Sequence, residues 1–335
     1  MRTMRTRASL VVLLVALIVV GAACGDTSGE SPTAESTTLA AGGFDCDTIE
    51  WVVPYAPGGG SDQQMRRLLP FVEEALGATV HPVYRTGGAA AVGWQSVADA
   101  EPDGCTVGTA VYPEIVLQTI GLPEEDTGFR VDSFTWITWT EAAPNALFVE
   151  IDSEFADIEA LLEQARAKPG GLTIGATAGA AGELVANQIQ EATGTELTFV
   201  GIDGGVGEIV PLLMGSHMDM GVGGAHHVVE AFLESARALA VAGSVRVPAL
   251  PDVPTFEELG YPGVTVATVW GVIGPAGMSE EAVTIWSEAL RAAGEAVAPE
   301  LVDMGLTSLN LTPADALEYT QTGYEDLSAV IEASE

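Results

Sequence analysis

The stretch from Ile49 to Asp62 reads IEWVVPYAPGGGSD. Its first seven residues form a short apolar run that is typical of a buried strand, and a helical pattern follows from about Ser61 to Leu76. The three glycines Gly58–Gly60 connect the expected strand to the expected helix. A glycine loop between a strand and a helix turns backbone N–H groups and the positive end of the helix outward, an arrangement that binds anions. The alternative is a tight turn that merely requires glycine.

This glycine loop does not match the common nucleotide-binding signatures, because GxGxxG and GxxxxGK[ST] are both absent. Asp62 follows the loop at the expected start of the helix. Its carboxylate is predicted either to cap that helix or to contact a ligand.

Strand-like runs and helical patterns alternate along the chain on both sides of a looser, tryptophan-containing stretch before Ala146. The expected strands are Val80–Tyr84, Cys105–Val111, Ala146–Glu150, Thr173–Ala176, Glu196–Val200, Met218–Val222 and Ala238–Val241. The expected helices include Ile158–Lys168, Val206–Met214, Ser279–Ala298 and Pro313–Ala333, the last two capped by Ser279 and Thr312. This alternation predicts an α/β fold with a parallel, doubly wound sheet.

Three further glycine-rich segments are expected to be loops that open helices. They are Arg85–Ala89, Gly175–Gly182 and Gly221–Ala225. With the first loop, they fall in two halves of the chain, so all four could face one another across a crevice between two domains. Such a crevice would bind a small anion largely through backbone dipoles.

The charge balance excludes several classes of protein. The 335 residues include 12 Lys and Arg against 47 Asp and Glu, which gives a formal net charge of −35. A surface this acidic repels nucleic acid and anionic lipid, so neither nucleic-acid binding nor a polybasic membrane site is expected. The length suggests two domains. The scarcity of lysine, with Lys168 alone, fits either a saline habitat or an ordinary acidic exported protein.

The N-terminus has the features of an export signal. Arg2, Arg5 and Arg7 precede the apolar run Leu10–Val20, and small residues lead to Cys24. Residues 1–23 are therefore expected to be a signal peptide, followed over residues 24–46 by a flexible tether. A cysteine directly after two small residues resembles a bacterial lipoprotein signal, which implies a lipid on Cys24 and an anchor to the membrane. Simple secretion is the alternative.

Two cysteines, Cys46 and Cys105, remain beyond Cys24. Because an exported protein folds in an oxidising compartment, an even remainder predicts one disulfide between them. If the strands next to these cysteines are parallel neighbours, both sulfurs lie at the same end of the sheet. No CxxC or HxxxH pattern occurs, so no metal site is expected.

Catalytic patterns are weak. There is no GxSxG motif, and the four histidines, His81, His217, His226 and His227, have no triad spacing. His226 and His227 are adjacent and are expected to point to different faces of a helix, which disfavours a shared metal. No catalytic residue and no cofactor are predicted. Among six tryptophans, Trp270 beside Gly271 is the best candidate for contact with a ligand.

Five segments carry a resemblance to a known family. They are Val52–Asp62, Arg85–Ala89, Ala100–Gly104, Ala249–Thr255 and Trp270–Gly277, and they span nearly the whole chain after the signal. Together they resemble the solute-binding receptors of tripartite tricarboxylate transporters, also called Bug-type proteins. The resemblance implies a periplasmic-binding-protein type II-like fold, with two doubly wound lobes joined by a two-crossing hinge. Lobe I would comprise residues 47–145 and 270–335, and lobe II residues 146–269.

The resemblance also implies a function. A receptor of this kind lies outside the cytoplasm, captures a small carboxylate of the di- or tricarboxylate class and delivers it to an integral-membrane permease, here as a monomer. The residues expected at the ligand are Gly59, Gly60, Ser61, Asp62, Gly88 and Ala89 on lobe I, Thr177, Ala178, Gly179 and Gly224 on lobe II, and Trp270.

The chain departs from the family pattern on the second lobe. After Val200 the family usually has a tyrosine or a similar residue with a lysine, whereas this chain has Gly201–Gly204. After Val222 it has Gly223 and Gly224 in place of the family's Asp-Ser.

Two other functions remain possible. One is an enzyme that acts on an anionic substrate, with Asp62, Asp203, His226 or His227 as general base. The other is a subunit that senses the ligand for a partner other than a permease.

Overall fold

The computed structural model describes residues 43–44, 46–202, 206–230 and 235–334. The predictions for residues 1–23, Cys24 and Asp203 lie outside this part of the chain. Along the part that the structure describes, no helix is both long and apolar enough to cross a membrane.

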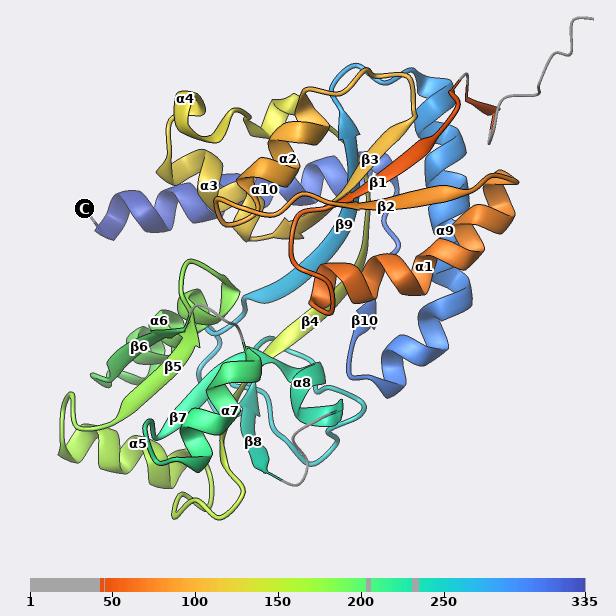
Figure 1. The fold of residues 1–335 in the computed structure, drawn as a ribbon. Helices are drawn as coiled ribbons and strands as arrows, with labels where there is room; N and C mark the ends of the chain where they lie inside the picture. Colours follow the sequence, from red (N-terminus) through yellow and green to blue (C-terminus); the bar gives the residue numbers. More distant parts are fainter. Residues whose placement is uncertain (1–42, 45, 203–205, 231–234, 335) are drawn as a thin grey trace, which may run out of the picture. The chain divides into compact units, whose positions relative to one another are not determined.

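Eight strands form one continuous order, β2-β1-β3-β9-β4-β7-β5-β6 (Figure 1). Their bounds are β2 (Val80–Tyr84), β1 (Ile49–Val53), β3 (Thr106–Tyr112), β9 (Ala267–Pro275), β4 (Phe134–Glu150), β7 (Met220–Gly224), β5 (Thr173–Thr177) and β6 (Thr198–Ile202). Two more strands, β8 (Ala236–Val241) and β10 (Thr307–Ser308), pair with β4.

The sheet is mixed, so the prediction of a purely parallel sheet was wrong. The sets β2-β1-β3 and β7-β5-β6 are parallel, but β9 is antiparallel to β3, and β4 is antiparallel to both β9 and β7. The tryptophan-containing stretch before Ala146 is the first part of β4. Pro144 in the middle of that strand obscured it, because proline removes a ladder donor and usually marks an edge or an end.

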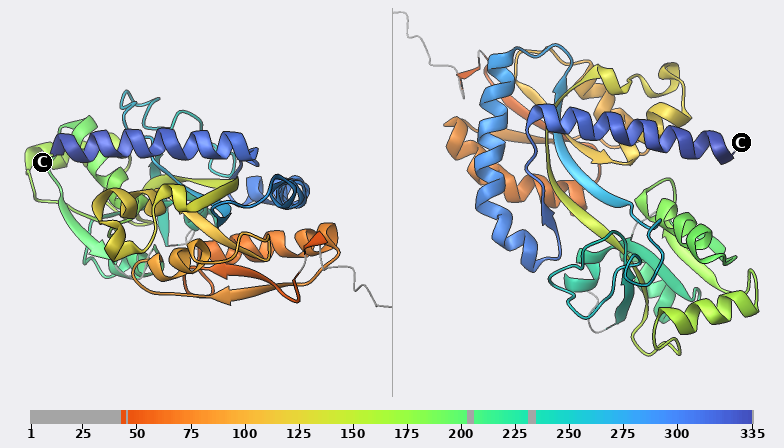
Figure 2. Two further views of the ribbon diagram at one scale, coloured as in Figure 1. Left: turned by 90° about the horizontal axis from the view of Figure 1, so that it is seen from above. Right: turned by 180° about the vertical axis from the view of Figure 1, so that it is seen from behind.

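Ten α-helices accompany these strands in the described chain: α1 (Gly60–Leu76), α2 (Ala91–Ala98), α3 (Glu114–Gly121), α4 (Glu124–Thr127), α5 (Ile158–Ala167), α6 (Ala181–Thr193), α7 (Val206–Met214), α8 (Ala225–Glu230), α9 (Glu280–Asp303) and α10 (Pro313–Ser334). Helix α1 packs on α9, and α10 packs on β4 and α3. Figure 2 shows α10 running across the sheet when the molecule is seen from behind.

Both predicted helix caps are confirmed. The Ser279 hydroxyl accepts a hydrogen bond from the amide of Ala282, and the Thr312 hydroxyl accepts one from the amide of Asp315. A side-chain oxygen in this position satisfies an N–H group that the first turn of a helix leaves free.

The hydrophobic core has three clusters. The first draws its residues from Phe44–Ala143 and Val269–Leu327, whereas the other two lie between residues 146 and 264. Phe44 is buried in the first cluster and stacks on Trp286, with ring centroids 6.0 Å apart. Phe44 therefore already belongs to the packed part of the chain, although the tether was predicted to continue to residue 46.

The structure contains the predicted disulfide between Cys46 and Cys105. The two Cα atoms lie 6.1 Å apart. The strands next to the two cysteines, β1 and β3, are parallel neighbours, with Glu50 opposite Thr106. Both cysteines consequently lie at the amino-terminal end of these strands, away from the glycine loops.

Candidate functional site

The predicted ligand residues of the first half lie at one edge of the sheet. Because β2, β1 and β3 are parallel, the loops that follow them emerge together at their carboxyl ends. The loop after β1 leads into α1 at Gly60, the loop after β2 contains Gly88 and Ala89, and the turn after β3 leads into α3 at Glu114. The sequence motifs therefore converge on this edge.

The start of α1 offers free backbone donors. Gly59 is the N-cap, and the amides of Gly60 and Ser61 have no acceptor within the described residues. The first N–H groups of a helix have no intrahelical partner, and the helix dipole adds partial positive charge there. Gly58 has φ +89°, a conformation that favours glycine.

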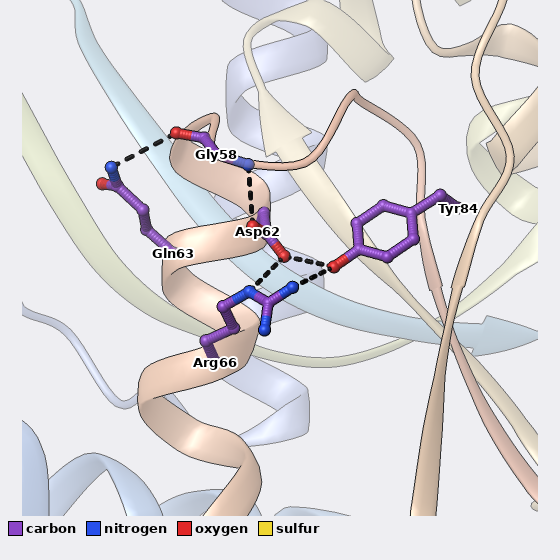
Figure 3. A network of polar contacts seen from close by, with 5 residues as sticks. All are labelled: Gly58, Asp62, Gln63, Arg66 and Tyr84. Atoms are coloured by element: carbon purple, nitrogen blue, oxygen red, sulfur yellow. Dashed lines mark hydrogen bonds and ion pairs between the residues drawn. The ribbon is translucent and has the colours of Figure 1, made fainter.

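Asp62 stabilises this loop from inside the helix (Figure 3). One carboxylate oxygen accepts a hydrogen bond from the Gly58 amide at 2.7 Å, and the other accepts from Arg66 Nε at 2.8 Å and from the Tyr84 hydroxyl. Burial raises the pKa of Asp62, but the hydrogen bonds from Tyr84, Gly58 and Arg66 outweigh it, so the pKa lies below its ordinary value. The prediction that Asp62 caps the helix was wrong, because Gly59 is the N-cap and no side chain caps it. Asp62 instead fixes the preceding loop through the Gly58 amide, and its contact with a ligand stays a prediction.

Trp270, on β9, lies against the first residue of α1. A Cβ atom on Gly60 would lie 2.6 Å from Cζ2 of its ring. Five tryptophans donate their indole N–H within the protein: Trp51 to Thr109, Trp94 to the carbonyl of Thr109, Trp136 to Val131, Trp139 to Ala316 and Trp286 to Gly104. Trp270 has no such acceptor among the described residues. Its indole is therefore a free donor beside the free amides of α1.

The loop after β2 has an unusual backbone. Gly88, Ala89 and Ala90 follow one another with positive φ values of 57°, 50° and 80°. The side-chain amide of Gln118 donates to the carbonyl of Ala89, which fixes the loop. The amides of Gly88 and Ala89 make no hydrogen bond to any described residue. Backbone amides exposed by such a conformation can form a small concave anion site.

The start of α6 repeats the arrangement at α1. Gly179, with φ +69°, donates its amide to Glu183 at 2.7 Å, as Gly58 does to Asp62 four residues later. Thr177 ends β5, and Ala178 donates its amide to the carbonyl of Ile202 at 3.2 Å. The predicted residues Thr177, Ala178 and Gly179 thus form the approach to a second helix N-terminus.

Glu114 is a site residue that the sequence analysis missed. It is the first residue of α3, and its Oε1 accepts a hydrogen bond from the Ala181 amide in the first turn of α6 at 3.3 Å. Burial raises its pKa to about 7, although its own amide and that of Ala181 act to lower it. The sequence did offer a signal for this site residue. Glu114 is an acidic residue that follows Tyr112 and Pro113 at the carboxyl end of a predicted strand.

The fourth predicted glycine loop is part of a strand. Residues Gly221–Gly224 belong to β7 and are buried. These glycines make room for neighbours, because a Cβ on Gly221 would lie 2.5 Å from Ile209 and one on Gly224 would lie 2.5 Å from His226. The role predicted for Gly224 at the ligand stays a prediction.

The adjacent histidines on α8 face each other, contrary to expectation, with ring centroids 3.9 Å apart. Burial lowers the pKa of His227 to about 4. Burial, with His227 and Arg67 nearby, lowers the pKa of His226 well below its ordinary value. Both rings are therefore neutral at neutral pH. No group of three or more metal-ligating side chains occurs among the described residues.

A buried ion pair lies close to these histidines. Arg67 of α1 donates to Glu141 of β4, whose side chain is 1% exposed. Burial raises the pKa of Glu141, and the charge of Arg67 partly offsets this. His226 contacts Trp270 edge to face, with ring centroids 5.9 Å apart. Glu141 is also the cross-strand neighbour of Trp270, so both the ion pair and His226 lie near this residue.

Comparison with known proteins gives consistent results. A family model described as the tripartite tricarboxylate transporter family receptor matches residues 43–335. The UPF0065 protein in the tcbD-tcbE intergenic region of Pseudomonas sp. (strain P51) is 31% identical over 252 residues, covering 72% of this chain and 71% of that protein.

Two solved structures share the fold. The periplasmic binding protein BugD superposes with a TM-score of 0.72 at 23% identity, covering 85% of this chain and 97% of that one. MatC (Rpa3494) from Rhodopseudomonas palustris with bound malate gives a TM-score of 0.73 at 23% identity, with coverage of 85% and 98%. These likenesses confirm the predicted fold class, the α/β periplasmic-binding-protein type II-like fold.

Proposed function

Because the chain belongs to the tripartite tricarboxylate transporter receptor family, we propose that it captures a small carboxylate outside the cytoplasm and delivers it to the integral-membrane permease of such a transporter. Family membership confirms the prediction that the protein binds a solute and is not an enzyme. The malate in MatC is a carboxylate of the expected size. Delivery to a permease of this transporter type is inferred from family membership.

One observation carries this proposal: unpaired neutral donors gather at the carboxyl edge of β2-β1-β3. They are the amides of Gly60 and Ser61, those of Gly88 and Ala89, and Nε1 of Trp270. Donors that are fixed before binding pay little ordering entropy when an anion arrives. Arg66 follows in the next turn of α1, where Asp62 and Tyr84 engage two of the three nitrogens of its guanidinium.

The second half of the chain is proposed to complete the site. The separate hydrophobic clusters support two lobes, residues 47–145 with 270–335 and residues 146–269, connected through β4 and β9. Closure of such lobes would bring Thr177, Ala178, Gly179 and Gly224 toward the ligand and exclude water from it. Desolvation would strengthen every hydrogen bond to the carboxylate.

We also propose that the mature protein is a lipid-anchored monomer, with the lipid on Cys24. The support is the order of basic, apolar and small residues before that cysteine. Mass spectrometry of the N-terminal peptide tests directly whether Cys24 carries a lipid. An unmodified peptide that begins at Cys24, or one that begins elsewhere, would contradict the anchor.

A thermal-shift screen tests the binding function. The chain without residues 1–23 is heated with mono-, di- and tricarboxylates and with their neutral amides, at low and high salt. A ligand at 100 times its Kd should stabilise the fold by about 2.7 kcal/mol. A shift with a carboxylate, and none with its neutral analogue, is the expected result. No shift with any carboxylate at either salt would refute the proposal.

A further inference from the structure

The anion position at the start of α6 is already occupied by a side chain of this protein. Glu114 Oε1 accepts a hydrogen bond from the amide of Ala181, the first residue of that helix. At α1, by contrast, the corresponding amides of Gly60 and Ser61 are free. The two similar helix starts therefore differ in what they can offer a ligand, because one has open donors and the other carries a carboxylate.

Glu114 and Gln118 together present acceptors that lack donors. They lie four residues apart, and so on one face of α3. Glu114 Oε2 and Gln118 Oε1 are both buried without a hydrogen-bond partner. The side-chain amide of Gln118 donates its N–H to the carbonyl of Ala89, in the loop after β2. No cationic side chain pairs with Glu114 within the described part of the chain. Buried acceptors without donors are costly, so a donor from outside would complement them.

Glu114 lies on the same edge as the proposed carboxylate site. It follows β3, the parallel neighbour of β1, and α1 begins just beyond β1. Tyr55 lies in the loop that leads to Gly58. Burial raises the pKa of Tyr55, and the charge of the nearby Glu114 raises it further. Glu114 thus lies between the loop before α1 and the start of α6.

We propose that Glu114, assisted by Gln118, selects the second functional group of the ligand, and that this group is a hydrogen-bond donor, above all an ammonium. The inference rests on the proposed function, because it assumes that the ligand's carboxylate binds the amides at α1. Once Glu114 is ionised, a second ligand carboxylate would meet its negative charge and the unpaired acceptor of Gln118. The favoured ligands are therefore monocarboxylates with an amino or amide group at the far end, in place of the di- or tricarboxylates that the sequence suggested.

Ligands matched in length test the selection. Titration calorimetry at a pH above 7, where Glu114 is ionised, compares succinate, succinamate, 4-aminobutanoate and butanoate, and then the corresponding five-carbon series. The proteins are the wild type, Glu114→Gln, and Glu124→Gln as the control. Glu124 is exposed on α4 and its side chain makes no hydrogen bond or ion pair, so its variant removes one negative charge away from the site. Thermal unfolding of each variant confirms that it is folded.

The wild type should bind the amine or amide at least about tenfold more tightly than the dicarboxylate of the same length, since a hydrogen bond to a charged group is worth that much. Glu114→Gln should reduce this preference at least about tenfold, and Glu124→Gln should leave it unchanged. Tight binding of the dicarboxylate to the wild type, or an unchanged preference in Glu114→Gln, would overturn the inference and leave the proposed function intact. Binding of no carboxylate in either series would contradict both.

Discussion

Trp270 lies so close to Gly60 that residue 60 has no room for a side chain, because a Cβ atom there would be 2.6 Å from Cζ2 of the indole. The contact joins β9 to the first turn of α1. It places the one tryptophan N–H without an acceptor in the described chain beside amides that are also free. Trp270 and the start of α1 together define the proposed carboxylate site.

Gly60→Ala should reduce the affinity for the carboxylate at least about tenfold, because the added methyl group must displace either the indole or the first turn of α1. Gly263→Ala is the matched control, since a Cβ atom at that exposed position would have no neighbour within 4 Å. Calorimetric titration measures both variants. Equal affinity of Gly60→Ala and wild type would show that this contact does not shape the site.

Trp270→Phe keeps an aromatic ring but removes the free indole N–H. The affinity for the carboxylate should fall about tenfold, the value of one hydrogen bond to a charged group. Trp136→Phe serves as the comparison, because Trp136 donates its N–H to the carbonyl of Val131. That variant should lose stability and keep its affinity. If the two variants bind the ligand equally well, Trp270 is not a ligand donor.

Glu141→Ala should destabilise the fold by about 3–5 kcal/mol, because it leaves the charge of Arg67 buried without its partner. Glu295→Ala removes the partner of Arg291 in an exposed pair, with side chains 59% and 63% exposed, and should cost less than about 1 kcal/mol. Urea unfolding at pH 7 gives both values. Similar losses in the two variants would contradict the structural role given to the buried pair.

The stability of the protein should depend on pH through Glu114. Its pKa is raised to about 7 in the folded state, whereas an unperturbed glutamate titrates near 4.5. Between these values the folded state holds this proton more tightly than the unfolded state, so the contribution of Glu114 to the free energy of unfolding falls as pH rises from about 4.5 to 7. The side chains that sense this charge, Tyr55 and Tyr112, stay neutral throughout that range because their pKa values are raised.

Unfolding of wild type and Glu114→Gln at several pH values isolates this effect. The wild type should lose on the order of 3 kcal/mol relative to the variant between pH 4.5 and pH 7. His226 and His227 also change the stability within this window, because their pKa values lie below the ordinary 6.5, but they do so in both proteins and cancel in the difference. A constant difference between the two proteins would show that Glu114 is ionised in the folded state at all these pH values.

Much of the first half of the site could be predicted from the sequence, because its chemistry lies in the backbone. Glycines at the carboxyl ends of strands indicate where the amides are exposed, and Gly59–Asp62 and Gly88–Ala89 emerge at the same edge of the sheet. The sequence could not show that the indole N–H of Trp270 is free. Which of the six tryptophans has an acceptor depends on tertiary packing.

The remaining differences have physical causes. Glycines also occur where neighbouring side chains need space, so Gly221–Gly224 was mistaken for a loop although Phe148 and Ile209 pack against that strand. The antiparallel strands β4 and β9 follow no simple alternation of strand and helix. The position of Glu114 at the start of α6 is a contact between residues 67 positions apart. Local sequence patterns carry no information about such a contact.

A crystal structure with a carboxylate that binds in the thermal-shift screen tests the central claim most directly. The account predicts the carboxylate oxygens within hydrogen-bond distance of the amides of Gly60 and Ser61 and of Nε1 of Trp270. A carboxylate bound elsewhere, for example at the guanidinium of Arg85 or Arg130, with the start of α1 unengaged, would contradict it.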